Sequence, residues 1–303
     1  MYGGKHMKET HPKLSIIIVN FNTKDLLSAC LTSLFTHKKK EDQWEILVVD
    51  NASSDGSLDE VKSHLDQIGT KVKSIKVHLI SNKVNLGYAA ANNQGIRASK
   101  GDYVLLLNSD TEVRNGTIDA MLTYMETHQS ISAATCRVEL SDGSLDPACH
   151  RGFPTPWAAY TYFSGLERLL PHSKLFSEYH QGYKDKTKEH TVDCISGAFL
   201  LIRRKIIEKV GLLDETFFMY GEDVDWCYRI RQKGFSIGFY PYVSILHRKK
   251  QSGRANEDES IQKRTKSYFY ETMKLFYTKH YRRRYGSLIS WLVLFGIKLR
   301  SYF

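Results

Sequence analysis

Cysteine is scarce in this sequence and is not paired. There are five cysteines in 303 residues, an odd number, and no two of them form a Cys-x-x-Cys motif. This pattern argues against a disulfide framework and against a zinc site built on cysteine pairs. We therefore expect free thiols, in a reducing cytosol, at Cys30, Cys136, Cys149, Cys194 and Cys227.

Long apolar runs are missing too. A membrane-spanning helix needs about twenty consecutive apolar residues, and the apolar stretch near the C-terminus, residues 288–297, is about half as long. The first ten residues have no apolar core of the kind that a secretory signal carries. We therefore interpret residues 1–12 as a leader or an expression remnant.

Negative charge is scarce at the C-terminal end. From Arg248 onward the chain carries 14 basic and 4 acidic residues, a net charge of +10 that equals the charge of the whole chain. Residues 1–247 are therefore neutral overall, and the protein has a neutral body with a basic tail. Such a tail suits an anionic membrane surface or a nucleic acid.

The overall composition is that of a globular protein. Hydrophobic residues make up 42% and charged residues 25%, which excludes a disordered, a collagen-like or a polytopic membrane chain. The length of 303 residues predicts one large domain or two small ones. A chain of this size buries enough surface to fold without disulfides or a structural metal.

Short β-branched runs alternate with helical patterns in the first half of the chain. Strands are expected at residues 14–19, 45–49, 77–80 and 103–107, with a helical segment after each of the first three. This alternation predicts β-α-β units and a mainly parallel sheet.

The second half is less regular. Further strands are expected at residues 197–203, 235–240 and 244–247. Residues 141–190 have no periodicity and are rich in proline, glycine, aromatic and charged residues. We interpret them as a long irregular excursion over one face, in contact with a substrate.

Polar loops follow three of the expected strands, at residues 20–23, 50–57 and 108–111. Ligands of open α/β sheets bind outside the carboxyl ends of the strands, so the first half predicts a nucleotide-type binding unit. Asp50 would accept hydrogen bonds from a base or a ribose, and the carboxylate of Asp110 would hold a divalent cation. Helix capping and a plain turn are the alternative interpretations.

Two further groups could carry chemistry. Residues 222–225 place three carboxylates at the start of a helix, which is either an ordinary dipole arrangement or a general base at Asp223. His247 ends an apolar run, and its neutral imidazole would be a good ligand for Mn²⁺. A histidine that merely satisfies its hydrogen bonds is the alternative.

The C-terminal region predicts two helices. The first covers about residues 256–280, and a basic cluster, residues 282–284, leads to the apolar stretch. Flanking basic residues with Trp291 and Phe295 are typical of a helix that lies on a membrane surface. The alternative is an ordinary terminal helix that docks on the core or on a second copy of the chain.

Taken in order, several segments resemble glycosyltransferase family 2. The resemblance runs from Leu14 to about His247 and is closest to the rhamnosyltransferase-like branch. Each segment is weak by itself, whereas their order and spacing together are specific. The segments are residues 15–22, 48–57, 85–95, 105–110, 197–199, 211–215, 218–225 and His247.

The resemblance implies an α/β architecture of the GT-A type, a Rossmann-like nucleotide-binding fold with a mainly parallel central sheet, over residues 13–250. It implies a nucleotide-sugar half at 13–115 and an acceptor and catalytic half at 116–250. Residues 251–303 would then be a helical basic extension. A nucleotide-sugar donor, a divalent cation (Mn²⁺ or Mg²⁺) and an inverting displacement are also implied.

Site residues follow from the motifs that match. Asp223 corresponds to the catalytic base, and Asp110 with His247 corresponds to the metal ligands. Arg151 and Trp157, from the irregular excursion, and Glu222 are assigned to the acceptor side. The implied nucleotide-sugar residues are Asn20, Asn22, Asp50, Asn85, Gly87, Asn92, Asn108 and Ser109.

One position departs from the family pattern. Asn108 stands where the Asp-x-Asp metal motif has its first aspartate. An amide oxygen still coordinates a cation but brings no charge. Rhamnosyltransferase-like members commonly share this substitution, so it favours that branch.

The implied activity is transfer of a sugar, L-rhamnose from dTDP-rhamnose, to a hydroxyl of a glycan or lipid-linked acceptor in cell-surface polysaccharide synthesis. The enzyme would lie in the cytoplasm, peripherally on the inner face of the cell membrane. A UDP-hexose donor is the first alternative, and a non-catalytic scaffold or a nucleic-acid-binding protein is the further one. For the proposed enzyme no nucleic-acid partner is expected, because no motif for one occurs. A homo-oligomer is a possible assembly, and the oligomeric state is left open.

Overall fold

The computed structural model describes residues 11–37, 43–69, 76–249 and 259–302. Most of the expected leader, residues 1–10, and the expected junction at residues 250–258 lie outside these ranges. All five cysteines are buried and unpaired, as expected.

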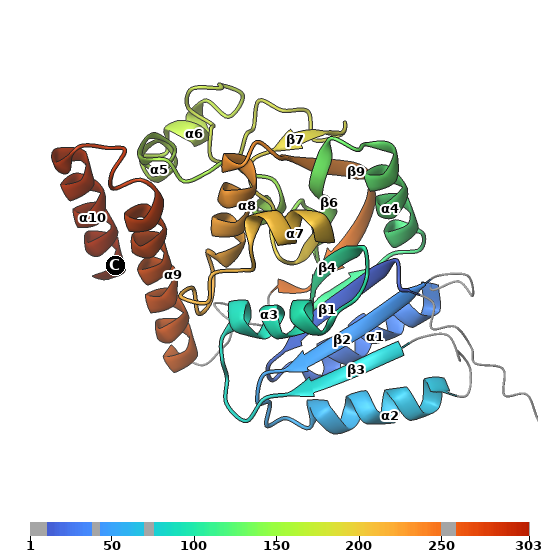
Figure 1. Ribbon diagram of the computed structural model, residues 1–303. Helices are drawn as coiled ribbons and strands as arrows, with labels where there is room; N and C mark the ends of the chain where they lie inside the picture. Colours follow the sequence, from blue (N-terminus) through green and yellow to red (C-terminus); the bar gives the residue numbers. More distant parts are fainter. Residues whose placement is uncertain (1–10, 38–42, 70–75, 250–258, 303) are drawn as a thin grey trace, which may run out of the picture.

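One nine-stranded sheet forms the centre of the described part of the molecule, in the order β3-β2-β1-β4-β8-β6-β9-β5, with β7 on β9 (Figure 1). The strands are β1 (Leu14–Asn20), β2 (Trp44–Asp50), β3 (Lys76–Ser81), β4 (Tyr103–Asn108), β5 (Thr111–Val113), β6 (Ile131–Leu140), β7 (His190–Val192), β8 (Phe199–Arg203) and β9 (Ser236–His247).

The first half of the sheet has the expected parallel β-α-β pairing. β1 lies between β2 and β4, and both pairs are parallel. The register puts Asn20 beside Asp50 and Val19 beside Asn108. The polar residues that follow these strands are therefore gathered at one edge of the sheet.

The second half is mixed. β8 is antiparallel to both β4 and β6, and β5 and β7 are antiparallel to β9. β6 and β9 are parallel, with register shifts at two places. The α/β fold is thus confirmed, and parallel pairing is confined to the first half and to the β6–β9 pair.

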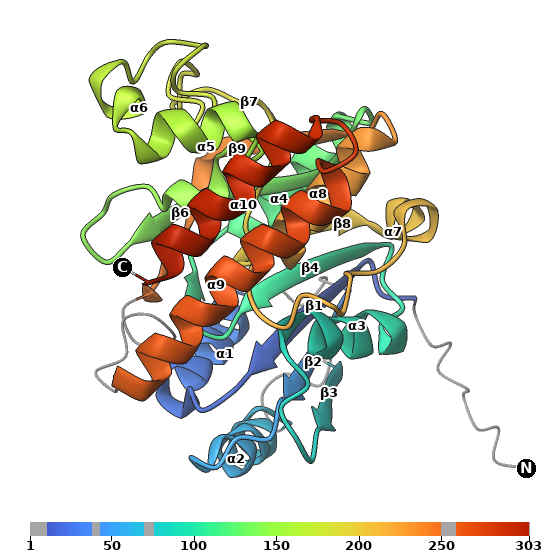
Figure 2. The ribbon, with the colours of Figure 1, turned by 90° about the vertical axis from the view of Figure 1, so that its left-hand side faces the viewer.

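Helices cover both faces of the sheet. α3 packs on β1 and β2, and α4 packs on β6 and β9. α9 and α10 pair with each other at the side of the sheet, next to α5 (Figures 1 and 2). The helices are α1 (Lys24–His37), α2 (Ser57–Gly69), α3 (Tyr88–Ala98), α4 (Thr117–Thr127), α5 (Pro156–Phe163), α6 (Leu166–Leu169), α7 (Arg204–Val210), α8 (Glu222–Gln232), α9 (Glu259–His280) and α10 (Ser287–Tyr302).

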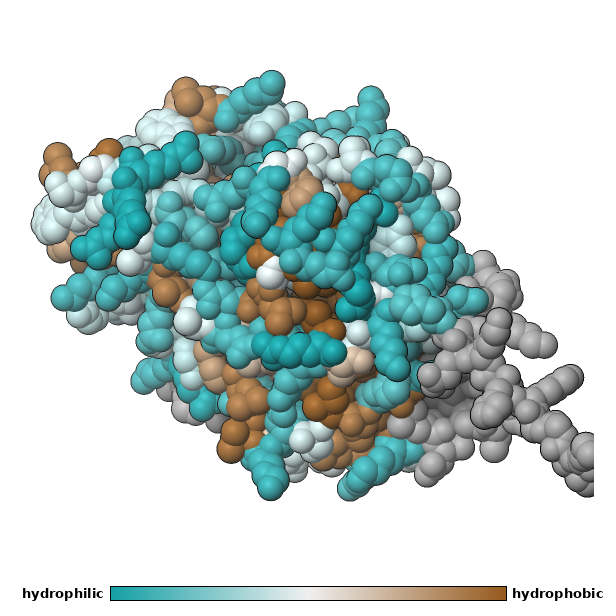
Figure 3. Space-filling view, in the orientation of Figure 1, coloured by the Kyte–Doolittle hydropathy of each residue, from teal (hydrophilic) through white to brown (hydrophobic). Residues whose placement is uncertain are grey.

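The surface shown in Figure 3 is mostly hydrophilic, and apolar side chains gather in the middle and the lower part of this face. β3 is the terminal strand, and its side chains are exposed or half-buried. None of the helices in the described ranges is long and apolar enough to cross a membrane.

The expectation of an irregular excursion at residues 141–190 is wrong in one respect, because α5 and α6 lie within it. Pro156 occupies the first turn of α5, where its missing N–H costs nothing. Thr155 caps the helix by accepting a hydrogen bond from Ala158 N at 3.0 Å. The helix is too short for periodicity to reveal it.

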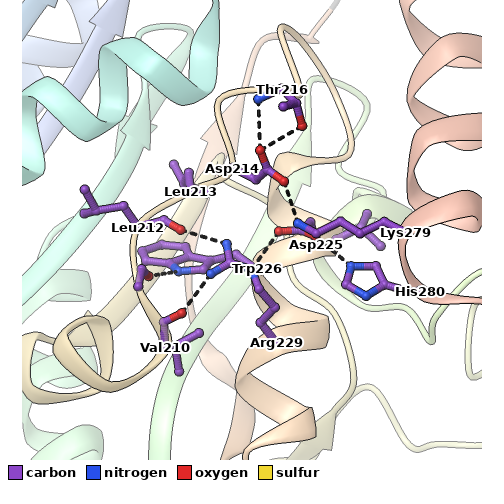
Figure 4. A network of polar contacts seen from close by, with 12 residues as sticks. Val210, Leu212, Leu213, Asp214, Thr216, Asp225, Trp226, Arg229, Lys279 and His280 are labelled. Atoms are coloured by element: carbon purple, nitrogen blue, oxygen red, sulfur yellow. Dashed lines mark hydrogen bonds and ion pairs between the residues drawn. The ribbon is translucent and has the colours of Figure 1, made fainter.

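A buried carboxylate fastens α9 to α8 (Figure 4). Asp225, on α8, contacts Nζ of Lys279 at 2.6 Å, Nε2 of His280 at 2.7 Å and Nε of Arg229 at 2.7 Å. Burial alone would raise the pKa of Asp225, but hydrogen bonds from His280 and Lys279 and the charge of Arg229 lower it to about 2. Because α8 begins with Glu222 and Asp223, this contact also fixes α9 relative to them.

Two of the matched segments meet at Gly87. Its φ of +87° is in the left-handed region, and a Cβ there would lie 2.5 Å from the carbonyl oxygen of Phe218. The next amide, of Tyr88, donates to that same carbonyl at 2.7 Å. Gly87 therefore has a packing role that joins the 85–95 segment to the 218–225 segment.

Gly87→Ala should lower the free energy of unfolding by about 2 kcal/mol or more, through strain and a backbone clash. Gly116→Ala is the matched control, since its φ is +75° but a Cβ would meet nothing within 4 Å. It should cost about 1 kcal/mol. Urea unfolding of both variants measures the difference, and equal losses would contradict the clash.

Acid should weaken the contact between α8 and α9. The pKa of Asp225 is lower in the folded chain than in the unfolded one, so its contribution is complete above about pH 4 and is lost as the pH falls through about 2. The shift corresponds to about 2 kcal/mol. Urea unfolding measures the free energy of unfolding between pH 5 and pH 2.5. Asp225→Asn should be less stable than the native protein at pH 5 and should lose less stability as the pH falls. An equal loss in the two proteins would contradict this prediction.

Candidate active site

A cavity of about 1190 Å³ opens beside the carboxyl ends of β4 and β9. The start of α8 forms another wall, and α5, α9 and α10 close the far side. The expected site residues that line it are Asn108, Asp110, Arg151, Glu222, Asp223 and His247. Residues expected to bind metal, donor and acceptor therefore share one space.

A hydrogen-bonded network adjoins this cavity at the ends of β1 and β2. Asn20 donates through Nδ2 to Asp50 Oδ1 at 2.9 Å and to Ser53 Oγ at 3.0 Å. The hydroxyl of Thr23 lies 2.9 Å from that of Ser109, which precedes Asp110. This network connects the loops after β1, β2 and β4, as the register of the strands requires.

Asn22 belongs to the same network. Its φ is +53°, its side-chain oxygen accepts from Ser54 N at 2.8 Å, and its own amide donates to Ser53 Oγ at 2.9 Å. Asn22 is therefore bound to the loop after β2 by two hydrogen bonds.

Asn85 and Asn92 make mainly local contacts. Asn85 Oδ1 accepts from Gly87 N at 2.9 Å and from Asn51 Nδ2 at 2.8 Å. Asn92 Nδ2 donates to the carbonyl of Tyr88 at 2.9 Å, within α3. Their contacts hold the chain in the shape that places Tyr88 on the cavity wall.

Asp110 and His247 meet at the cavity wall. Asp110 Oδ1 lies 3.2 Å from His247 Nε2, and both side chains are buried. The pairing of Thr111 with His247 between β5 and β9 brings them together. On its other side, His247 Nδ1 lies 2.9 Å from Asp146 Oδ2.

The electrostatics of this pair are those of a histidine between two carboxylates. Burial alone would lower the pKa of His247, but hydrogen bonds to Asp110 and Asp146 raise it to about 9. A carboxylate and an imidazole are ligands that suit Mn²⁺, and Asp146 orients the ring as an outer carboxylate does in metal sites. Asp110 and His247 are therefore two candidate ligands for a divalent cation, and His247 would have to release the proton that it holds between the two carboxylates in order to bind one. Within the described residues no group of three His, Cys, Asp or Glu side chains could hold a metal ion.

The side-chain oxygen of Asn108 is hydrogen-bonded to a tyrosine. Its Oδ1 accepts a hydrogen bond from the Tyr88 hydroxyl at 2.7 Å, and that hydroxyl also contacts the Gly197 carbonyl at 3.2 Å. A Cβ at position 197 would lie 2.8 Å from the Tyr88 oxygen, which explains the glycine. The side-chain amide of Asn108 is thus a fixed, uncharged part of the cavity wall beside Asp110.

Asp223 is paired with a buried cation. Arg151 Nη2 lies 2.9 Å from Asp223 Oδ2, and the two side chains are 15% and 13% exposed. Asp223 Oδ1 also accepts from Val224 N at 2.7 Å. Both groups face the cavity, and their contact fixes the orientation of the Asp223 carboxylate.

Glu222 has the opposite environment. Its Oε2 is buried and, in the described part of the chain, has no hydrogen-bond partner. Burial, and then the charge of Asp223, raise the pKa of Glu222 to about 8. Left-handed backbone at Tyr220 and Gly221, with φ of +67° and +79°, sets the turn that presents both carboxylates.

Trp157 does not line the described cavity. It is 41% exposed, its indole N–H donates to the carbonyl of Leu175 at 2.7 Å, and its ring packs near Tyr160 and Phe176. Its assignment to the acceptor side stays a prediction, and the cavity lining includes its ring neighbour Tyr160 but not Trp157 itself. Arg151, from the same segment, does line the cavity.

Sequence reasoning missed Asp146 and Tyr88 as site residues. Asp146 lies in the stretch without periodicity, and nothing in its neighbourhood marks it as a partner of His247. Tyr88 stands in a matched segment, but its contact with Asn108 is made across 20 residues. Both are found from long-range contacts rather than local pattern.

Comparisons with known proteins agree with this geometry. The family described as "Glycosyl transferase family 2" matches residues 15–211. The low-salt glycan biosynthesis hexosyltransferase Agl10 of Haloferax volcanii is 30% identical over 241 residues, covering 77% of this chain and 66% of Agl10, just under two thirds of its length. The N-acetylglucosaminyl-diphospho-decaprenol L-rhamnosyltransferase of Mycobacterium tuberculosis is 28% identical over 255 residues, covering 79% of this chain and 77% of that protein.

A solved structure shares the fold. The mannosyltransferase PcManGT of Pyrobaculum calidifontis, in complex with GDP-Man and Mn²⁺, superposes with a TM-score of 0.62 at 15% identity. The superposition covers 97% of this chain and 70% of that one. The architecture is thus that of the GT-A glycosyltransferases.

Raising the pH from 5 to 8 should lower the free energy of unfolding, because the buried Glu222 then loses its proton. Its pKa is higher in the folded chain than in the unfolded one, so stability is complete below about pH 4.5 and falls as the pH rises toward 8. Glu222→Gln removes this titration. Urea unfolding at pH 5, 6.5 and 8 should show a smaller loss of stability for the variant; an equal loss would contradict the neutral state of Glu222.

Proposed function

Because this chain belongs to glycosyltransferase family 2, we propose that it moves a hexose from a nucleotide-sugar donor to an acceptor hydroxyl with inversion at the anomeric carbon. The observation that carries the proposal is the shared cavity, which holds Asp110 and His247 on one wall and Asp223 on another. A group that holds a leaving diphosphate and a group that takes a proton must face the same sugar.

The donor side is built on Asp110 and His247. These two residues would hold Mn²⁺ or Mg²⁺, which supplies charge that offsets the leaving nucleoside diphosphate. The nucleoside itself would lie on the network at the ends of β1 and β2, near Asn20, Asn22 and Asp50. Asn108 and Ser109 line the passage between the two, and Asn85, Gly87 and Asn92 shape it through Tyr88.

The acceptor side is built on Asp223. As the hydroxyl oxygen forms its bond to the anomeric carbon, the bond from that carbon to the diphosphate oxygen breaks, and the hydroxyl proton passes to Asp223. Arg151 holds Asp223 in position through an ion pair of 2.9 Å. Glu222, neutral at pH 7, can donate a hydrogen bond to the incoming sugar without adding charge.

The donor we favour is dTDP-L-rhamnose. A relative named as an L-rhamnosyltransferase supports this choice, and so does Asn108 at the first position of the metal motif. A UDP-hexose is the alternative, supported by the relative named as a hexosyltransferase. The acceptor would be a glycan or a lipid-linked sugar in cell-surface polysaccharide synthesis.

We place the enzyme on the inner face of an anionic membrane through α10. The residues Leu288, Trp291, Leu292, Phe295, Leu299 and Tyr302 recur at helical spacing and are 48–72% exposed. The rings of Trp291 and Phe295 stack at 5.4 Å. Exposed basic residues flank this stripe at 282–284 and at Lys298, which is the pattern of an interfacial helix.

Asp223→Asn should lower transfer by about 10³-fold, since a positioned base contributes about 10²–10⁴. Donor binding should be unchanged. The control is Asp142→Asn, a carboxylate on the rim of the same cavity that caps its own turn at Ser144, and it should remain active. Near-normal turnover in Asp223→Asn would end the assignment of the base.

Calorimetric titration should separate the two donors. dTDP-rhamnose, UDP-glucose, UDP-galactose and UDP-GlcNAc are titrated with Mn²⁺ or Mg²⁺, and then with EDTA. We expect dTDP-rhamnose to bind at least about tenfold more tightly, a difference of about 1.4 kcal/mol, and EDTA to weaken it. Selective binding of a UDP-sugar would move the protein to the alternative, and no binding would favour a scaffold.

Vesicle flotation should test the membrane face. Trp291→Ser with Phe295→Ser removes two large apolar side chains and should weaken partition onto phosphatidylglycerol-containing vesicles at least about tenfold. Val84→Ser is the control, because Val84 is an apolar residue that is 62% exposed and lies far from α10 in the sequence. This substitution should leave the partition onto vesicles unchanged. Equal partition of all three proteins would contradict a membrane role for α10.

A further inference from the structure

We propose that the part of the cavity between α5, α9 and α10 binds the hydrocarbon chain of a lipid-linked acceptor. The proposal rests on the proposed function, because it takes Asp223 as the group that the acceptor hydroxyl reaches. It narrows the acceptor from a glycan or a lipid-linked sugar to an amphiphile. Such a molecule has a sugar at one end, a phosphate group between, and an apolar chain at the other.

The first observation is continuity. The same cavity that contains Asp110 and Asp223 extends to residues of α5, α9 and α10. Its volume of about 1190 Å³ exceeds the ~300–1,000 Å³ of a typical ligand pocket. A sugar at the catalytic carboxylates therefore leaves room that runs toward the helices.

The second observation is the chemistry of the far walls. α9 contributes Phe269, Met273 and Phe276, and α10 contributes Val293 and Ile297. These side chains are apolar, and methionine adapts its shape to irregular chains. A carbohydrate chain would need hydrogen-bonding groups along such a surface, whereas a hydrocarbon chain would not.

The third observation concerns the exposed apolar residues of α10. Leu292 and Leu299 belong both to the exposed apolar stripe and to the cavity lining. Trp291 and Phe295 belong to the stripe and do not line the described cavity. On α5, Tyr160 and Tyr162 line the cavity and are also 58% and 45% exposed. The apolar cavity thus opens beside the surface that we place on the membrane, where a lipid chain would enter.

The positively charged residues of the cavity indicate which ligand would bind there. Two cations, Arg300 and Lys249, also line the cavity, and Lys249 Nζ lies 2.9 Å from Asp146 Oδ1. Arg300 lies over the Phe163 ring at 4.4 Å and gives one N–H to the Phe163 carbonyl, and a guanidinium has five N–H donors. A lipid whose sugar is joined through phosphate matches both the cations and the apolar walls, whereas a helix from a second copy would bring no sugar hydroxyl to Asp223.

Gly296 provides a clean test of this surface. It lies on α10, lines the cavity, and a Cβ there would meet nothing within 4 Å. A tryptophan at this position would begin from a Cβ that meets no neighbour, would fill part of the cavity, and would improve helix propensity. Gly286 is the matched control, because a Cβ there also meets nothing within 4 Å and it does not line the described cavity.

The binding experiment uses the full chain in EDTA, without vesicles. Farnesyl diphosphate, lyso-phosphatidylglycerol and inorganic diphosphate are titrated by calorimetry into the native protein, G296W and G286W. We expect farnesyl diphosphate to bind at least tenfold more tightly than inorganic diphosphate. G296W should lose that preference and G286W should keep it. Equal affinity of the two diphosphates, or an unchanged preference in G296W, would overturn the proposal.

The lyso-phospholipid arm separates two sources of an apolar chain. Preference for farnesyl diphosphate supports an acceptor lipid with a phosphate-linked head. Tighter binding of lyso-phosphatidylglycerol would show that the cavity takes a bilayer lipid instead, and would overturn the assignment to the acceptor.

A transfer experiment separates this proposal from the proposed function. With an established donor, the KM of a long-chain lipid-linked sugar should rise at least tenfold in G296W, while kcat with a short-chain glycoside of the same sugar stays unchanged. Transfer to the short-chain glycoside with no advantage for the long chain would overturn the lipid site and leave the glycosyltransferase assignment standing. Binding of farnesyl diphosphate without transfer to any acceptor would overturn the proposed function and, with it, the acceptor role of this site.

Discussion

Buried negative charge at one edge of the sheet is the constraint on which the rest of this structure depends. Asp110, Asp146, Glu222 and Asp223 are all buried there. Ionised carboxylates remain in such a place only when cations or protons compensate them. His247 stands between Asp110 and Asp146, Arg151 meets Asp223, and Glu222 stays protonated. Each compensation also leaves a group oriented toward the cavity.

The scaffold brings these groups together from distant parts of the chain. Parallel pairing ends β1, β2 and β4 at one edge, and β9 returns to the same edge beside β5, which places His247 on Asp110. The turn before α8 presents Glu222 and Asp223, and Asp225 one turn on fastens α9 to the same helix. The α9 wall of the cavity is thus attached to the helix that carries Asp223.

Much of this arrangement could be predicted from local patterns, and the rest could not for a physical reason. Buried strands and the loops after them have short-range signals, so the parallel half and the positions of Asp50, Asp110 and His247 were accessible. α5 is too brief for a periodic pattern, and the direction of the Trp157 side chain could not be predicted because it depends on that helix. The contact of Asp146 with His247 could not be predicted, because neither segment carries a sequence pattern that points to the other. The same holds for the contacts of Lys279 and His280 with Asp225.

The central claim of this account is that metal ligands and base act on the same sugar from opposite sides. The most direct test is the configuration of the product, read by proton NMR from the anomeric signals after transfer from a donor of known configuration. The account predicts that the new glycosidic bond has the configuration opposite to that of the bond to the diphosphate. Retention of the donor's configuration would contradict it, because a base at Asp223 that activates the acceptor for a single displacement inverts the centre.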